Sequence, residues 1–218
     1  MTTRHRDSAR LRTARSGELL ELVRRGHAQT TSELATLMGC ARSTVQERVQ
    51  VLLREGLLQS TVAVPQGRGR PAVGLEFNPS AGVVLAVQVG VSGSRVAITD
   101  LATEVLWSDV VDVGISSRPK DLVQAVRATT ERALTSIHED AARLRGIGIG
   151  LPGKVELATA SPADVGEWLR YPIADDLAER YGVPAYLDQD VNLLALGEQR
   201  SSWPDTDVFV CLKVGTVI

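Results

Sequence analysis

The sequence lacks the segments that would place a protein in a membrane or in an oxidising compartment. No run of about 18 apolar residues occurs in the chain, so we expect no transmembrane helix. The N-terminus is rich in arginine but has no apolar core segment, which argues against a secretory signal. The two cysteines, Cys40 and Cys211, form no disulfide or metal-binding pattern. We therefore expect a reduced, cytoplasmic protein.

Charge is distributed unevenly along the chain. Of the 218 residues, 44% are hydrophobic and 23% are charged, which is typical of a soluble globular protein. Residues 1–71 contain twelve Arg and six Asp or Glu, a net charge of +6, whereas residues 72–218 carry a net charge of −8. A basic region confined to one end of an acidic chain is suited to attracting phosphate groups.

Residues 30–55 predict two short helices joined by a tight turn. Thr30 and Glu33 have the spacing of a capping box, which satisfies the free amides at a helix start. The first helix would then bury an apolar face, and Gly39 would end it in the left-handed conformation. That apolar face consists of Leu34, Leu37 and Met38.

The second of these helices has a buried stripe and a polar face. Val45, Val49, Leu52 and Leu53 recur at the spacing of one helical face. Short hydroxyls, amides and arginines near the helix start are suited to phosphates and base edges. An ordinary helical hairpin with a solvated polar face is the alternative. The candidate DNA-binding residues of this helix are Arg42, Ser43, Thr44, Gln46, Glu47 and Arg48.

The surrounding residues extend this pattern to a winged helix-turn-helix over residues 16–78. Residues 1–15 form a basic arm, and a first helix begins near Ser16 and ends at Gly26. Strands are expected at residues 57–64 and 73–77, with a basic loop between them. In that loop Arg68 and Arg70 alternate with glycines and suit a narrow minor groove, although a solvated linker loop is the alternative.

Residues beyond the boundary at 78–82 predict a mixed α/β sheet with helices on its faces. Three strands are followed by alternating helices and strands, without a tandem repeat. The expected strands are 83–89, 95–101, 104–113, 144–150, 183–187 and 207–214, and the expected helices are 119–142, 173–181 and 193–200.

A polar segment, Asp188-Gln189-Asp190-Val191-Asn192, is expected to form the turn between a strand and a helix. Ligands bind at such strand ends in open α/β sheets. A carboxylate at this place can accept hydrogen bonds from a polyol or act as a general base toward a hydroxyl. The alternative is that Asp190 and Asn192 only cap the helix.

These segments together resemble the ROK family (repressors, open reading frames and sugar kinases), in its transcriptional-regulator branch. Each match is weak by itself, whereas their order and spacing are specific. The matching residues are Gly67-Arg68-Gly69-Arg70-Pro71, Asn78-Pro79, Gly90, Gly146 to Gly153, Trp168 with Pro172, Asp188 to Asn192, Gly197-Glu198 and Val214-Gly215-Thr216.

The resemblance implies an actin-like ATPase (ribonuclease H-like) fold of two α/β lobes with a sugar in the cleft. Asp190 corresponds to the catalytic base of the kinases, and Gly153 and Gln189 correspond to sugar-contacting positions. Residues 81–205 would form the first lobe, and residues 206–218 the first strand of a second lobe that is otherwise missing. No cofactor is expected, because the family's zinc motif would lie beyond residue 218. We expect the chain to be a truncated form.

Two departures from the family pattern oppose ATP binding. The kinases have an Asp two residues before the first phosphate-loop glycine, where this chain has Gln88 before Gly90. Their second loop is Gly-Thr-Gly, whereas Val217 replaces the last glycine here. A β-branched side chain would crowd the amides that cradle phosphate, so phosphoryl transfer would lack its electrostatic clamp.

We therefore expect a sequence-specific DNA-binding transcriptional regulator that is not an enzyme. It would repress carbohydrate-related genes, respond to a sugar or sugar phosphate, and act as a homodimer or higher oligomer on double-stranded DNA. A carbohydrate kinase fragment that phosphorylates a hexose with ATP is one alternative. A dimerising interaction protein that binds neither DNA nor sugar is a weaker one.

Overall fold

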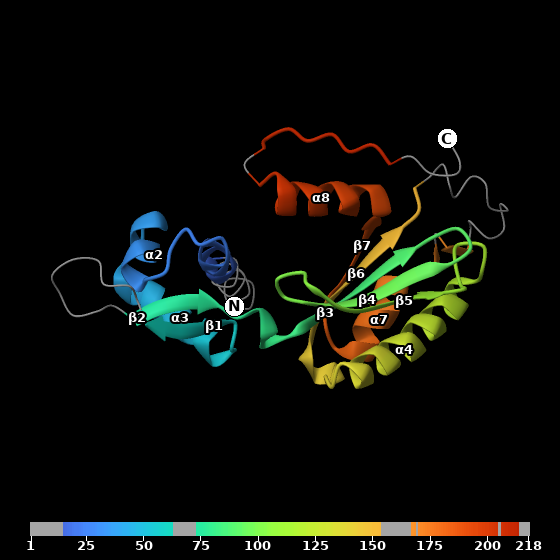
Figure 1. The fold of residues 1–218 in the computed structure, drawn as a ribbon, viewed down its shortest axis with the longest axis horizontal. Helices are drawn as coiled ribbons and strands as arrows, with labels where there is room; N and C mark the ends of the chain where they lie inside the picture. Colours follow the sequence, from blue (N-terminus) through green and yellow to red (C-terminus); the bar gives the residue numbers. More distant parts are fainter. Residues whose placement is uncertain (1–14, 63–72, 154–166, 169, 205, 214–218) are drawn as a thin grey trace, which may run out of the picture. The chain divides into compact units, whose positions relative to one another are not determined.

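A computed structural model describes residues 15–62, 73–153, 167–168, 170–204 and 206–213 (Figure 1). The chain divides into two compact units, residues 1–81 and 82–218. No helix in the described part is long and apolar enough to cross a membrane. Residues 1–14 of the arm predicted at 1–15, and the loop with Arg68 and Arg70, lie outside the described residues, whereas residue 15 is helical.

The first unit contains three helical segments and a two-stranded sheet. Residues 15–24 are helical, and they are followed by α2 (Thr31–Leu37) and α3 (Arg42–Arg54). Strands β1 (Leu58–Val62) and β2 (Val73–Phe77) pair antiparallel, with Leu58 opposite Phe77. Apolar residues from every element form one core, because each helix has one apolar face. That core comprises Leu19, Val23, Ala28, Leu34, Val45, Val49, Leu52, Leu58 and Leu75.

The helix ends in this unit are set by local sequence signals. Thr30 and Glu33 form the predicted capping box, in which each side chain binds the other residue's amide. The Glu33 carboxylate also accepts a hydrogen bond from the Gln29 amide. This bond, followed by those with Thr30, lowers the pKa of Glu33. Gly39 has a φ of 60°, as expected for the left-handed residue after α2. The expectation for Leu37 was wrong, because α2 has only seven residues and buries Leu34 alone, while Leu37 is 56% exposed.

The second unit is a five-stranded mixed sheet in the order β5-β4-β3-β6-β7. Strands β3 (Val83–Val89), β4 (Ser94–Asp100) and β5 (Val105–Val111) are antiparallel neighbours. Strands β6 (Leu144–Leu151) and β7 (Ala185–Gln189) continue the sheet in parallel. The predicted α/β lobe is therefore confirmed at the level of its mixed sheet.

Helices cover the two faces of this sheet unequally. In Figure 1, α4 (Pro119–Ser136) and α7 (Ile173–Tyr181) lie on one face, and α8 (Asp190–Ser202) lies over the other. Alternate residues of β3 and β6, such as Leu85 and Ile149, are buried in the core beneath α4 and α7. The face toward α8 carries small residues instead, including Ala86, Gly148 and Gly150.

Most of the other predicted boundaries shift by one to three residues, and three segments differ more clearly from the sequence prediction. Helix α4 ends at Ser136 instead of residue 142, because His138 adopts a φ of 57° and turns the chain toward β6. Asp188 to Asn192 is not a turn, since β7 ends at Gln189 and α8 begins at Asp190. Residues 207–213 form no strand, because no neighbouring strand among the described residues offers backbone partners.

Candidate functional site

The predicted DNA-contacting residues of α3 fall on two sides of the helix. Arg42 and Gln46 line a groove of about 410 Å³ toward the β1–β2 sheet. Thr30 and Ser60 also line this groove. Thr44, Glu47 and Arg48 line a separate depression with Ser16 and Leu57, on the side of the first helical segment. The sequence prediction grouped these α3 residues together as DNA-contacting, with Glu47 pointing away from the buried stripe and Thr44, Gln46 and Arg48 flanking it.

Exposure distinguishes the members of this set further. Arg42, Ser43, Gln46 and Glu47 are exposed, and of these Ser43 and Glu47 lie opposite Val45 and Val49 by helical spacing. Thr44 and Arg48 are only partly exposed, and the Nη1 atom of Arg48 is buried without a hydrogen-bond partner in the described structure. Arg48 is therefore the least accessible member of the set to a DNA backbone.

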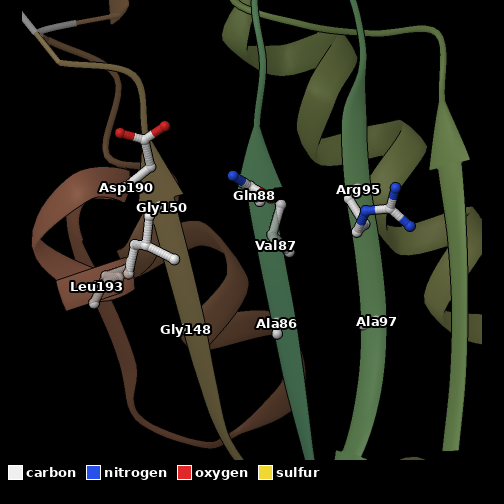
Figure 2. A pocket seen from close by; sticks show the side chains of 10 residues that line it. Ala86, Val87, Gln88, Arg95, Ala97, Gly148, Gly150, Asp190 and Leu193 are labelled. Atoms are coloured by element: carbon white, nitrogen blue, oxygen red, sulfur yellow. The ribbon is translucent and has the colours of Figure 1, made fainter. Parts of the chain in front are cut away.

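The second candidate site is a cavity of about 340 Å³ over the sheet face toward α8. Its polar side chains are those of Gln88, Arg95 and Asp190, and its other lining residues are Ala, Gly, Val or Leu. Figure 2 shows Asp190 and Leu193 at one side of the cavity, Gln88 near its middle and Arg95 beyond it on β4. Asp190 was a sequence prediction, whereas Arg95 was not.

The start of α8 packs closely against Gly150 of β6. A Cβ atom at Gly150 would lie 3.4 Å from Asp190 Cβ and from Leu193 Cδ1, at the short limit of ordinary van der Waals contact. Asp190 is the first residue of α8, where the helix dipole favours a negative charge. The start of α8 therefore lies directly on the sheet.

Asp190 is paired with a residue that the sequence reasoning missed. The Asp190 side chain is 5% exposed, and its Oδ2 accepts a hydrogen bond from Lys213 Nζ in the segment after α8. A buried carboxylate needs such a partner, because desolvation of an unpaired charge is costly. No motif marks Lys213, since it lies 23 residues from Asp190 in a segment that was expected to be a strand.

The other predicted sugar-binding residues, Gln189 and Gly153, are not among the residues that line the cavity. Gln189 ends β7 and is exposed, and Gly153 follows β6 by two residues. Asn192 does not cap α8 but donates a hydrogen bond to Asp188, which lowers the pKa of the Asp188 carboxyl together with the Gln189 amide. In the described ranges, no cluster of His, Cys, Asp or Glu is suited to a metal ion.

Comparison with known proteins identifies the family. Residues 84–218, more than half of the chain, match the ROK family. This chain belongs to the ROK family. It is 25% identical over 188 residues to a putative xylose repressor of Caldicellulosiruptor sp. (strain Rt8B.4), covering 84% of this chain and 47% of that protein. It is also 26% identical over 117 residues to a glucokinase of Halalkalibacterium halodurans, covering 52% of this chain and 35% of the glucokinase.

A solved structure shows the same fold. The crystal structure of a ROK family transcriptional regulator, described as a homologue of the Escherichia coli Mlc protein, aligns with a TM-score of 0.70. At 21% sequence identity, the alignment covers 90% of this chain and 50% of that chain. The ROK chain described here thus spans about half the length of the repressor and of the regulator that it matches.

Proposed function

We propose that this ROK chain contains the DNA-binding region and a sensor region of a transcriptional repressor of carbohydrate-related genes. The supporting observation is the exposed, polar start of α3 beside the β1–β2 sheet, in the unit with a net positive charge. This arrangement supports a winged helix-turn-helix in which α3 enters the major groove. Arg68 and Arg70 of the connecting loop are proposed to contact the minor groove.

Salt dependence tests this proposal. Affinity for a DNA duplex taken from the upstream region of the gene, measured by fluorescence anisotropy, should fall steeply as salt rises, since each neutralised phosphate contributes a slope of about −0.9. Arg42→Ala, Arg68→Ala or Arg70→Ala should each weaken DNA binding. Arg132→Ala on α4 removes the same charge from the other unit and serves as the control, which should leave DNA binding unchanged. Affinity that is independent of salt and of these arginines would contradict DNA binding.

The effector is proposed to bind at the cavity beside Asp190. The Asp190 carboxylate lines this cavity and can accept hydrogen bonds from sugar hydroxyls. Gly153 and Gln189, which are not among the lining residues, are proposed as further contacts. Binding would shift the orientation of the sensor and move the two α3 helices of a homodimer out of register with their half-sites. A mobility-shift titration with neutral and phosphorylated sugars tests this switch, which fails if no sugar changes operator affinity.

A carbohydrate kinase remains the second candidate, because a glucokinase is among the relatives and Asp190 matches the base of the kinases. Two features oppose it: Lys213 binds the Asp190 carboxylate, and Gln88 replaces the acidic residue near the phosphates. A coupled ADP-release assay with ATP and a hexose separates the two functions. Turnover that Asp190→Asn abolishes would favour the kinase.

A further inference from the structure

The charges around the cavity do not cancel. Among the described residues that line the cavity, Asp190 is the only acidic one, and Lys213 already neutralises that carboxylate. Arg95 also lines the cavity and is exposed, and its side chain has no hydrogen-bond or ion-pair partner among the residues that the structure describes. The described groups therefore leave one unmatched positive charge at a cavity whose remaining surface is mostly apolar.

The strand register places the polar groups in a row. Arg95 is directly opposite Gln88, and Gln88 is directly opposite Gly150, against which Asp190 packs. With neighbouring strands about 4.8 Å apart, the Cα atoms of Arg95 and Gly150 are separated by roughly 10 Å. That width is on the scale of a monosaccharide that carries one charged substituent.

The side chains in this row offer different chemistry at the two ends. The Asp190 carboxylate accepts hydrogen bonds, and Figure 2 shows the Gln88 amide directed toward it across the cavity. The Arg95 guanidinium is directed away from Asp190, toward the neighbouring strand β5. Since the Arg95 side chain is long and exposed, a rotamer change can turn its guanidinium over the cavity.

We propose that the ligand of this cavity is an anionic monosaccharide, whose phosphate or carboxylate group is bound by Arg95 and whose hydroxyl groups are bound by Asp190. The planar guanidinium donates paired hydrogen bonds that match phosphate and carboxylate oxygens. The uncharged Gln88 amide can donate to the same anion without repelling it. Arg95 is thus the residue that determines the charge class of the effector. This inference rests on the proposed sensor function of the same cavity.

Calorimetric titration of the 218-residue chain tests the proposal with matched pairs of ligands. The pairs are glucose and glucose 6-phosphate, xylose and xylose 5-phosphate, and N-acetylglucosamine and its 6-phosphate, with glucuronate as the carboxylate arm. At least one anionic ligand should bind at least tenfold more tightly than its neutral counterpart. Preference for a phosphate or for glucuronate identifies which anion the cavity takes.

Two arginine variants separate a direct contact from a general effect of charge. Arg95→Gln should weaken binding of the anionic ligand about tenfold, which corresponds to about 1.4 kcal/mol, and leave any binding of the neutral sugar unchanged. Arg132→Gln makes the same change of charge on α4, on the other face of the sheet, and should leave both affinities unchanged.

Three results would overturn the proposal. They are equal affinity for a neutral sugar and its anionic form, an Arg95→Gln variant that binds the anion as well as the wild type, and no binding of any anionic ligand in the set. Anisotropy measurements with DNA on the same preparations keep this result separate from the proposed function. Anionic sugar binding without DNA binding would contradict the repressor and support the cavity assignment.

Discussion

Helices α3 and α8 have the same length and are held in different ways. Each has 13 residues, and neither has a side-chain cap at its N-terminus. Helix α3 buries Val45, Val49 and Leu52, whereas the one buried residue of α8 is Asp190. Leucines of α8 such as Leu194 and Leu196 are about half exposed. Hydrophobic burial therefore fixes α3, while α8 depends on contacts at its first turn.

The largest expected effect comes from removing matched leucines from the two helices. Leu52→Ala should destabilise the N-terminal unit by about 2–5 kcal/mol, since Leu52 is 5% exposed and the truncation leaves a cavity. Leu194→Ala should cost less than about 0.5 kcal/mol, because that side chain is 47% exposed. Denaturant unfolding followed by circular dichroism measures both, and equal losses would contradict the comparison.

Removing the partner of Asp190 should affect α8 and leave α3 intact. Lys213→Met leaves the buried carboxylate without its ammonium partner, and the expected loss is about 1–3 kcal/mol. The lower end applies, because the Lys213 side chain is 33% exposed. Hydrogen exchange of the α8 amides from Leu193 onward, which have acceptors inside the helix, should accelerate, while amides of α3 stay protected.

Lys120→Met provides the control for this variant, because it removes an exposed lysine from α4. If Lys213→Met and Lys120→Met give the same exchange at α8, the ion pair does not hold the helix.

Capping offers a smaller test within the N-terminal unit. Thr30→Ala should cost about 1 kcal/mol, because Thr30 Oγ1 accepts the hydrogen bond of the Glu33 amide at the start of α2. Conversely, Ala41→Ser should stabilise α3 by up to about 1 kcal/mol, since Ala41 provides no side-chain cap. Thermal unfolding of the two variants should shift in opposite directions, and shifts of the same sign would refute this assignment.

Acid should weaken the N-terminal unit through Glu21. Hydrogen bonds from Arg24 and then Arg25 lower the pKa of Glu21 from 4.5 to about 2. The ionised carboxylate is favoured in the folded state, so its stabilisation is complete above pH 4.5 and is lost as the pH falls toward 2.

Unfolding titrations of the wild type and Glu21→Gln across this range measure the effect. The stability difference between the two proteins should shrink as the pH falls. A difference that is constant with pH would assign the effect to packing instead of ionisation. The effect is small, because the Glu21 side chain is about one-third exposed.

The sequence predicted an element well where the residues that define it lie close together in the chain. The limits of β3 and α7 and the Thr30–Glu33 capping box are as predicted, because alternation, helical spacing and capping involve residues a few positions apart. Prediction was less accurate for α4, whose end depends on the left-handed conformation of His138. Because His138 is not a glycine, the sequence carries no signal that the helix ends there.

Of the candidate ligand site, the sequence predicted Asp190 through its motif but neither Arg95 nor Lys213. Arg95 lines the cavity because β3 lies between β4 and β6 in the sheet, which places Arg95 of β4 in register with Gln88 and Gly150. Lys213 reaches Asp190 because the chain after α8 returns along that helix, as Figure 1 shows. Neither relation has a local signal.

By itself, the sequence determined the basic and acidic halves, the apolar stripe of α3 and the position of Asp190 at a strand-to-helix junction. Only the tertiary structure decided what lies beside each polar residue of α3. It also decided that Asp190, already paired with Lys213, faces a cavity lined by an Arg95 side chain without a partner among the described residues. The physical reason is range: periodicity and capping act within a few residues, whereas strand register and the pairing of buried charges depend on the course of the whole chain.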